Sequence, residues 1–161
     1  MQSVLIKVAR FGRQPGFVQI WFFPVWVGLG IARLAILTIS FKRLVPRLGV
    51  SVGVQPWLPL LDQREEKTAR MVGQVIRQAA RLTPWDSNCF PQAVVARVLL
   101  GWYGVPYCLF FGVRRKASDG AFDAHAWVGA GRVKVIGGWG FNKYAVVGVF
   151  AAPQLTRNKS E

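Results

Sequence analysis

The two cysteines and the single histidine are the residues of this chain best suited to nucleophilic chemistry. Cys89 falls in the first turn of a predicted helix, where the helix dipole favours a thiolate, and His125 falls within a predicted strand. An imidazole near such a thiol takes up its proton. We therefore expect Cys89 to be a nucleophile and His125 its base, whereas Cys108 in mid-strand lacks the helix dipole. The alternative, two small core cysteines and a hydrogen-bonded strand histidine, stays open at this point.

Two helices are expected before residue 104. From 64 to 82 the apolar residues recur at helical spacing, which predicts an amphipathic helix packed on the core. Thr83-Pro84 then breaks the chain before a mostly apolar helix that ends near Gly101–Gly104. Asp86 or Ser87 is the expected cap of this second helix, which places Cys89 in its first turn.

Beyond Gly104 the hydrophobic period changes to two, which predicts strands. We place them at about 106–113, 122–129, 132–137 and 144–151. Ala130-Gly131 is the expected hairpin turn. Helices followed by consecutive strands with short turns predict an α+β fold with a small antiparallel sheet.

The first 63 residues are apolar and basic. No acidic residue occurs within 1–61, and 14–32 is free of charge, with a length and aromatic content that suit a membrane helix. Pro24 and Arg33 oppose a membrane span. We expect 14–41 to be a helix or hairpin packed on the domain, with a membrane-surface element and a true span as alternatives. The expected division is a helical N-terminal segment and connector at 1–63, a core at 64–152 and a polar tail at 153–161.

Composition places the chain among folded, basic proteins. Of its 161 residues 52% are apolar, and 21 Lys and Arg against 7 Asp and Glu give a net charge of +14. Such a surplus attracts nucleic acid, anionic lipid or acidic polypeptides without choosing among them. Two cysteines and one histidine are too few for a four-ligand zinc site, and no cofactor or metal is expected. Two cysteines without a recognisable secretory signal favour a reduced, cytosolic setting.

Four short motifs follow one another in a fixed order along the chain. They are Trp85-Asp86-Ser87-Asn88-Cys89-Phe90-Pro91-Gln92-Ala93, then Leu99-Leu100 with Tyr103-Gly104-Val105-Pro106, then Leu109-Phe110-Phe111-Gly112-Val113, then Phe122-Asp123-Ala124-His125-Ala126-Trp127-Val128. In this order they resemble the stand-alone leader peptidases of lasso peptide biosynthesis, which belong to the transglutaminase-like cysteine hydrolases. The resemblance is strongest over roughly 65–138. The apolar N-terminal helix is also similar to that family, which favours a packed helix over a membrane span.

The resemblance implies a fold, an activity and partners. The fold would be a transglutaminase- or papain-like core, in which the helix bearing Cys89 packs on an antiparallel sheet bearing His125. The activity would be removal of the leader peptide from a ribosomally made precursor, before an ATP-dependent lasso cyclase closes a macrolactam. A separate leader-recognition protein would deliver the precursor, since we expect no such domain in this chain. Cys89 would be the nucleophile, and His125 the general base and then the general acid.

The group that holds His125 is where the sequence departs from the family. The family's more familiar pattern has an aspartate on the strand after the histidine, yet the only acidic residue after His125 is Glu161. Across the predicted hairpin, Ile136-Gly137 lies opposite His125 instead. Asp123 shares a strand face with His125 and is the first candidate for the third catalytic residue. Asn142 and a backbone carbonyl are the alternatives.

Two other functions compete with a leader peptidase. One is a non-catalytic basic module that binds a membrane or nucleic acid, and the other is a related cysteine amidase or acyltransferase. Nucleic acid is not expected as a partner, because the positive charge is not gathered on one helix with interleaved aromatic residues. The expected partners are the leader region of the precursor, the recognition protein and the cyclase, with a membrane surface as a further contact of 14–41. The expected location is the cytoplasm, with membrane association as an addition.

Overall fold

The computed structural model describes residues 14–40, 43, 48–54, 57–116, 120–138, 140 and 142–152. Its elements in chain order are α2 (Gly16–Thr38), β1 (Val50–Ser51), α4 (Gln63–Ala80), α5 (Cys89–Trp102), β2 (Cys108–Arg115), β3 (Phe122–Ala130), β4 (Val133–Ile136) and β5 (Ala145–Ala151). The predicted α+β class is confirmed. The polar tail expected at 153–161 lies outside the described residues.

The strands form one five-stranded sheet in the order β1-β5-β2-β3-β4, and every neighbouring pair is antiparallel. The four predicted strands are all present, with ends shifted by one or two residues. The sequence did not reveal β1, because two residues are too few to show a period. It comes from the connector expected before residue 64 and pairs with β5 at the edge of the sheet.

Helix α4 has the sequence signals of a well-defined start. Asp62 is its N-cap: its carboxylate accepts from the Glu65 backbone N–H at 2.7 Å, and Glu65 accepts in return from the Asp62 N–H at 2.9 Å. This reciprocal capping satisfies two backbone donors that the helix itself cannot pair. The buried side of α4 is a stripe at helical spacing, made of Ala69, Val72, Gly73, Val75, Ile76 and Ala79.

Helix α5 starts at Cys89 and ends in a glycine motif. Its N-cap is Asn88, whose side chain makes no capping hydrogen bond, so the expected cap at Asp86 or Ser87 is wrong by one or two residues. At the other end Gly104 has a φ of +66°, and the Val105 N–H bonds back to the Leu100 carbonyl at 2.9 Å. This bond is the Schellman pattern, and it turns the chain from α5 towards β2.

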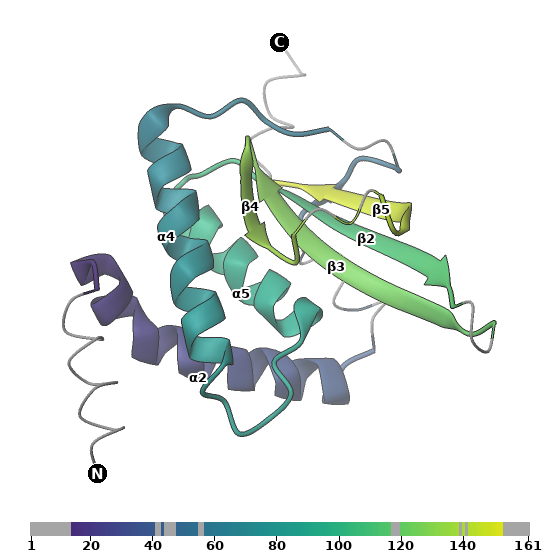
Figure 1. Cartoon of the computed structure of the whole chain (residues 1–161), viewed down its shortest axis with the longest axis horizontal. Helices are drawn as coiled ribbons and strands as arrows, with labels where there is room; N and C mark the ends of the chain where they lie inside the picture. Colours follow the sequence, from purple (N-terminus) through teal and green to yellow (C-terminus); the bar gives the residue numbers. More distant parts are fainter. Residues whose placement is uncertain are drawn as a thin grey trace.

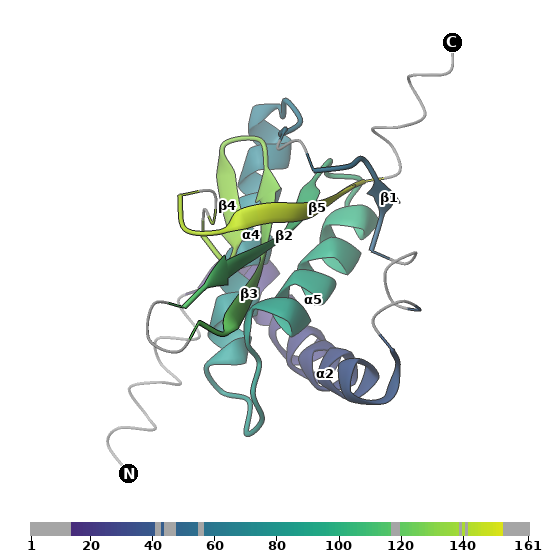
Figure 2. The same cartoon turned by 90° about the vertical axis from the view of Figure 1, so that its right-hand side faces the viewer.

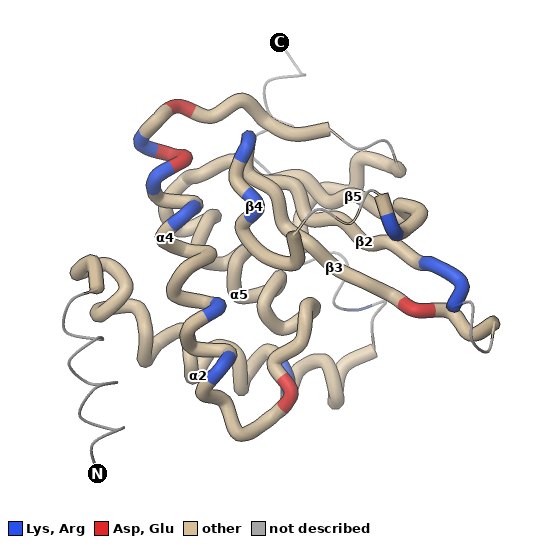
Figure 3. The backbone as a smooth tube through the Cα atoms, viewed as in Figure 1, with Lys and Arg blue, Asp and Glu red and all other residues tan. Residues whose placement is uncertain are grey.

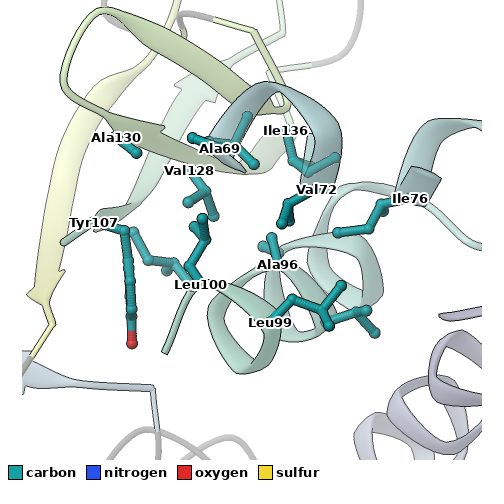
Figure 4. Packing of buried hydrophobic residues seen from close by; sticks show 14 of the residues in the cluster. Ala69, Val72, Ile76, Ala96, Leu99, Leu100, Tyr107, Val128, Ala130 and Ile136 are labelled. Atoms are coloured by element: carbon teal, nitrogen blue, oxygen red, sulfur yellow. The ribbon is translucent and has the colours of Figure 1, made fainter. Parts of the chain in front are cut away.

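The helices form two layers on one face of the sheet (Figures 1 and 2). Helices α4 and α5 lie directly on the sheet, and α2 packs on α4 and α5 rather than on a strand. The main core fills the space between α4, α5 and the sheet, where Val72, Ile76, Leu100 and Val128 converge (Figure 4). Helix α5 therefore has neighbours on two sides.

A second, smaller cluster lies on the other face of the sheet. Its fully buried members are Cys108, Phe110, Trp127, Val149 and Ala151. Tyr144, from the segment before β5, packs against this cluster together with Val52, Leu58 and Val146. Because side chains alternate along a strand, odd-numbered residues of β3 face this cluster and even-numbered ones face α5.

Helix α2 is one continuous helix that runs through Pro24, so of the helix and the hairpin that the sequence left open, the helix is present. Its inner side buries Val18, Val25, Leu29 and Ala32 in the main core. By length and composition α2 could cross a membrane, and among the described residues it is the one helix that passes this test. Its outer side is largely exposed.

Candidate active site

The thiol of Cys89 sits at the N-terminal end of α5. The side chain is half-buried and packs against the main core cluster. The backbone N–H of Cys89, at the first helical position, has no carbonyl partner within the helix, and together with the helix dipole it favours negative charge at this end. The placement predicted for the nucleophile is therefore present.

The segment just before Cys89 is held from outside by α2. The indole N–H of Trp26 donates to the Leu82 carbonyl at 3.1 Å, and the Trp26 ring lies 4.8 Å from the Trp85 ring between centroids. Further along, the Arg33 guanidinium lies 3.7 Å from the Asp86 carboxylate. Three contacts from one helix thus fix the loop that delivers Cys89.

His125 projects from β3 beside two aromatic rings, which also contact each other at 6.5 Å between centroids. Its ring centroid lies 5.0 Å from that of Tyr144 and 5.8 Å from that of Trp127, both nearly parallel. Its Nε2 atom lies 2.9 Å from the Gly137 carbonyl oxygen, just after β4. A carbonyl only accepts, so Nε2–H is the donor, and Nδ1 carries the lone pair of the neutral imidazole.

Asp123, the first candidate for the third residue, does not hold the imidazole in this structure. Its carboxylate accepts from Arg114 Nε at 2.8 Å and from the Tyr144 hydroxyl at 3.1 Å. The Arg114 hydrogen bond is the main reason that the pKa of Asp123 is lowered. Among the described residues no hydrogen bond joins His125 to Asp123 or to Asn142. The backbone carbonyl, one of the two alternatives, takes this position instead.

Asp123 is connected to His125 through Tyr144, which it binds and which stacks on the imidazole. The Tyr144 hydroxyl is bound by Asp123, and the Arg114 guanidinium lies over the Tyr144 ring at 4.9 Å. Desolvation, followed by the hydrogen bond to Asp123, raises the pKa of Tyr144, so this phenol stays protonated and keeps donating. Two contacts therefore fix the ring that stacks on the imidazole.

Cys89 and His125 line one cavity of about 400 Å³. The rest of its lining is apolar and comes from α5, β2, β3 and β5: Phe90, Phe111, Gly112, Val113, Ala124, Ala126, Val147, Gly148 and Phe150. The pairing of β2 with β5 shifts register between Phe111 and Gly112, directly at this cavity. Such irregularities often re-aim residues near active sites.

The structure brings the thiol and the imidazole to one cavity without joining them. Cys89 packs with the cluster on the α5 side of the sheet, whereas the His125 ring lies over Trp127 on the other side. No hydrogen bond between the two side chains occurs among the described residues. The Cys89 thiol is nevertheless near enough to contribute, as the smallest of several causes, to the raised pKa of Tyr144. Catalytic hydrogen bonds are often loose before substrate binds.

The second cysteine has the opposite environment. Cys108 is fully buried in the smaller cluster, and burial raises the pKa of its thiol to about 12. A thiol that stays protonated is a poor nucleophile. Cys108 is therefore a core residue, as its weaker position in the sequence indicated.

Other side chains near the site support it. Gln92 gives its amide N–H to the Ser87 carbonyl, so that group orders the start of α5. Trp127 is fully buried, and its ring stacks on that of His125. Sequence reasoning missed Tyr144; its only signal was an aromatic residue placed just before the last strand. Within the described residues no three His, Cys, Asp or Glu side chains gather in a way that would hold a metal ion.

The site combines a helix that begins with a half-buried cysteine and an antiparallel sheet that carries a histidine. The family model of the transglutaminase-like superfamily matches residues 35–148, more than half of the chain. The chain belongs to the transglutaminase-like superfamily. The matched part of this transglutaminase-like chain starts within α2 and ends within β5, so it includes Cys89 and His125. No curated protein and no solved structure matches the chain.

Membership of this superfamily indicates the general class of chemistry. Transglutaminase-like proteins are generally cysteine-based enzymes that form an acyl intermediate on the thiol. For this transglutaminase-like chain, the class agrees with a thiol at a helix start and an imidazole on a neighbouring strand. It does not choose a substrate.

Proposed function

We propose that this protein is a cysteine peptidase that removes the leader peptide from a ribosomally synthesised lasso peptide precursor. The observation that carries the proposal is that Cys89 at the start of α5 and His125 on β3 line the same apolar cavity. The four motifs that resemble lasso leader peptidases contain both residues, and the family match covers them. A leader-recognition protein and a lasso cyclase are the partners that this role requires.

In the proposed reaction His125 Nδ1 takes the proton of the Cys89 thiol. The thiolate attacks the scissile carbonyl carbon, and the oxyanion is met by the backbone N–H of Cys89 at the start of α5. The C–N bond breaks as His125 gives the proton to the leaving amine of the core peptide. A water molecule, deprotonated by the same imidazole, then hydrolyses the thioester and releases the leader with a free carboxylate.

The Gly137 carbonyl supports these steps in a particular way. It selects the tautomer that leaves Nδ1 free, as a carboxylate would. It carries no net charge, however, so it stabilises the imidazolium less than an aspartate does. We infer less stabilisation of the imidazolium than in enzymes with a full triad, and a site that gains from a bound partner or substrate.

We expect partner dependence because no hydrogen bond joins the Cys89 thiol to the His125 imidazole among the described residues. Delivery of the precursor by a recognition protein converts a bimolecular encounter into a local one at high effective concentration. The net charge of +14 would speed the encounter with an acidic partner and make it sensitive to salt. The isolated protein is therefore expected to cleave slowly.

The test is cleavage of a purified precursor, followed by mass spectrometry, with and without the recognition protein and at two salt concentrations. Cys89→Ala should abolish cleavage, whereas Cys108→Ala is the matched control and should keep most of it, since Cys108 lies away from the cavity. A Cys108 variant that is folded and inactive beside an active Cys89 variant would overturn the assignment. Equal rates in all four conditions would overturn the partner dependence.

The same assay separates a hydrolase from an acyltransferase. The apolar cavity lining favours exclusion of water, which would also suit transfer of the acyl group to an amine. Adding a small primary amine to the reaction gives the leader either as a free acid or as an amide. Amide as the main product at low amine concentration would make acyl transfer the better assignment.

A further inference from the structure

One side of α2 is covered by the domain and the other is not. Six large apolar residues at intervals of three or four form a continuous stripe on the uncovered side, which we name the outer face of α2: Ile20, Phe23, Val27, Ile31, Leu34 and Leu37. Phe23 is 68% exposed and Leu34 is 62% exposed. The stripe is about 25 Å long at the rise of an α-helix. A helix that is apolar all round is normally buried on all sides.

The outer face continues onto α5. A groove of about 340 Å³ runs between the two helices, and its lining, which includes Ile31, Val98 and Trp102, is apolar. Val98 and Trp102 are themselves exposed, Trp102 by 73%. The uncovered apolar surface is therefore wider than one helix. Surfaces of this kind mark interaction sites.

The chemistry of this surface is unusual for a protein–protein contact. The outer face of α2 holds no charged residue, and the single charged residue of the helix, Arg33, is turned to Asp86. Figure 3 shows α2 almost without charged residues, whereas Lys and Arg mark α4, β4 and the end of β2. Transient protein interfaces are about as polar as the rest of a surface and have a polar rim.

Basic residues flank the helix in the sequence. Lys7, Arg10 and Arg13 precede it, and Lys42, Arg43 and Arg47 follow it. Cations beside an apolar, aromatic-rich helix are the combination that binds anionic lipid: the apolar side enters the headgroup region and the cations meet the phosphates. The net charge of +14 adds a longer-range attraction to the same surface.

From these observations we propose that the outer face of α2 docks the protein on an anionic membrane surface. The helix lies on the membrane and does not cross it. Its inner side is part of the core, with Leu29 fully buried, and Trp21 and Trp26 hydrogen-bond to Tyr103 and to the Leu82 carbonyl. A transbilayer position would require all of these contacts to break.

Vesicle co-sedimentation of the full chain tests the proposal without any peptide substrate, so its outcome is separate from that of the peptidase assay. Wild-type protein should bind vesicles of phosphatidylcholine with phosphatidylglycerol, and bind phosphatidylcholine alone more weakly. The double variant Phe23→Gln/Leu34→Gln should lower the affinity at least about tenfold, because two inserted apolar side chains are lost. The matched control is Val54→Gln/Leu60→Gln, which changes exposed apolar residues outside α2 and should bind as the wild type does.

Circular dichroism melting checks that both double variants remain folded. Absence of binding to anionic vesicles, or equal loss in both double variants, would overturn the proposal. The proposal would also be overturned if the α2 variant bound vesicles as the wild type does and changed its oligomeric state or its complex with the recognition protein. The outer face would then be a protein-binding surface. In cells, release from membranes by alkaline carbonate is expected, and retention until detergent is added would indicate a span.

Discussion

The Nε2 atom of His125 lies 2.9 Å from the carbonyl oxygen of Gly137, so a backbone carbonyl occupies the position that a carboxylate has in a Ser-His-Asp triad. The carbonyl reaches this position because Gly137 has a φ of +77° and passes close to β3. A Cβ at Gly137 would lie 2.6 Å from the Ala126 carbonyl oxygen, so backbone would have to move to make room.

This relationship gives a matched pair of glycine substitutions. Gly138 also has a positive φ, of +67°, but a Cβ there would meet nothing within 4 Å. Both alanine variants should lose about 1 kcal/mol of stability from backbone strain, and Gly137→Ala should lose more because its Cβ would clash with Ala126 and Trp127. Only Gly137→Ala should also lower the cleavage rate strongly, because it moves the carbonyl away from His125. Similar rates for the two variants would show that the carbonyl is not needed for catalysis.

The Tyr144 ring is expected to position the imidazole, and two substitutions test its hydrogen bond to Asp123. Tyr144→Phe keeps the stack on His125 and loses the hydrogen bond to Asp123. Asp123→Asn keeps the stack and weakens the same hydrogen bond. Both should lower the single-turnover rate less than His125→Ala, which removes the base itself. The pH–rate profile supplies the second readout, since a positioning role shifts the apparent pKa of the base. An Asp123 variant as slow as His125→Ala would make Asp123 a full member of the catalytic group.

The two thiols should differ in their reaction with iodoacetamide. Because burial raises the pKa of Cys108 to about 12, this thiol stays protonated as well as shielded from pH 7 to pH 9. Cys89 at the start of α5 should be alkylated in the native protein, and Cys108 only after denaturation. Mass spectrometry of tryptic peptides measures both sites in one experiment. Labelling of native Cys108 at the rate of Cys89 would contradict the buried position.

The two sides of α2 should respond differently to the same substitution. Leu29 is fully buried, so Leu29→Ala should lower the free energy of unfolding by about 2–5 kcal/mol. Leu34 is on the outer face, and Leu34→Ala should change that free energy by less than about 0.5 kcal/mol. Urea unfolding followed by circular dichroism gives both values. A large loss in the Leu34 variant would mean that the outer face is covered within the protein.

The sequence was a good guide where one face of an element is polar. Helix α4 has apolar residues at helical spacing on one side and charged residues on the other, so its period is visible. Period two also placed Asp123, His125 and Trp127 on one strand face, where the structure has them. The same alternation implies that Ala124 and Ala126 face the cysteine helix, which explains why the imidazole is not hydrogen-bonded to the thiol.

The sequence was a poor guide where contacts depend on the backbone or on uniformly apolar residues. The carbonyl of Gly137 has no side-chain signature, although the predicted hairpin did place this residue opposite His125. The faces of α2 could not be told apart, because apolar residues surround the helix. The bond from Tyr144 to Asp123 depends on a loop that comes close only when β5 pairs with β2, whereas Arg114 lies directly opposite Asp123 in the β2–β3 pair.

Helix α2 holds the loop that leads into the nucleophile. Its contacts at Leu82, Trp85 and Asp86 all fall within the eight residues that lead into Cys89, and a Cβ at Gly30 would press within 2.9 Å of the Trp85 ring. The position of the thiol is therefore set in part by a helix that does not line its cavity. Membrane binding at the outer face of α2 would act on the thiol both through this loop and through the packing of α2 on α5.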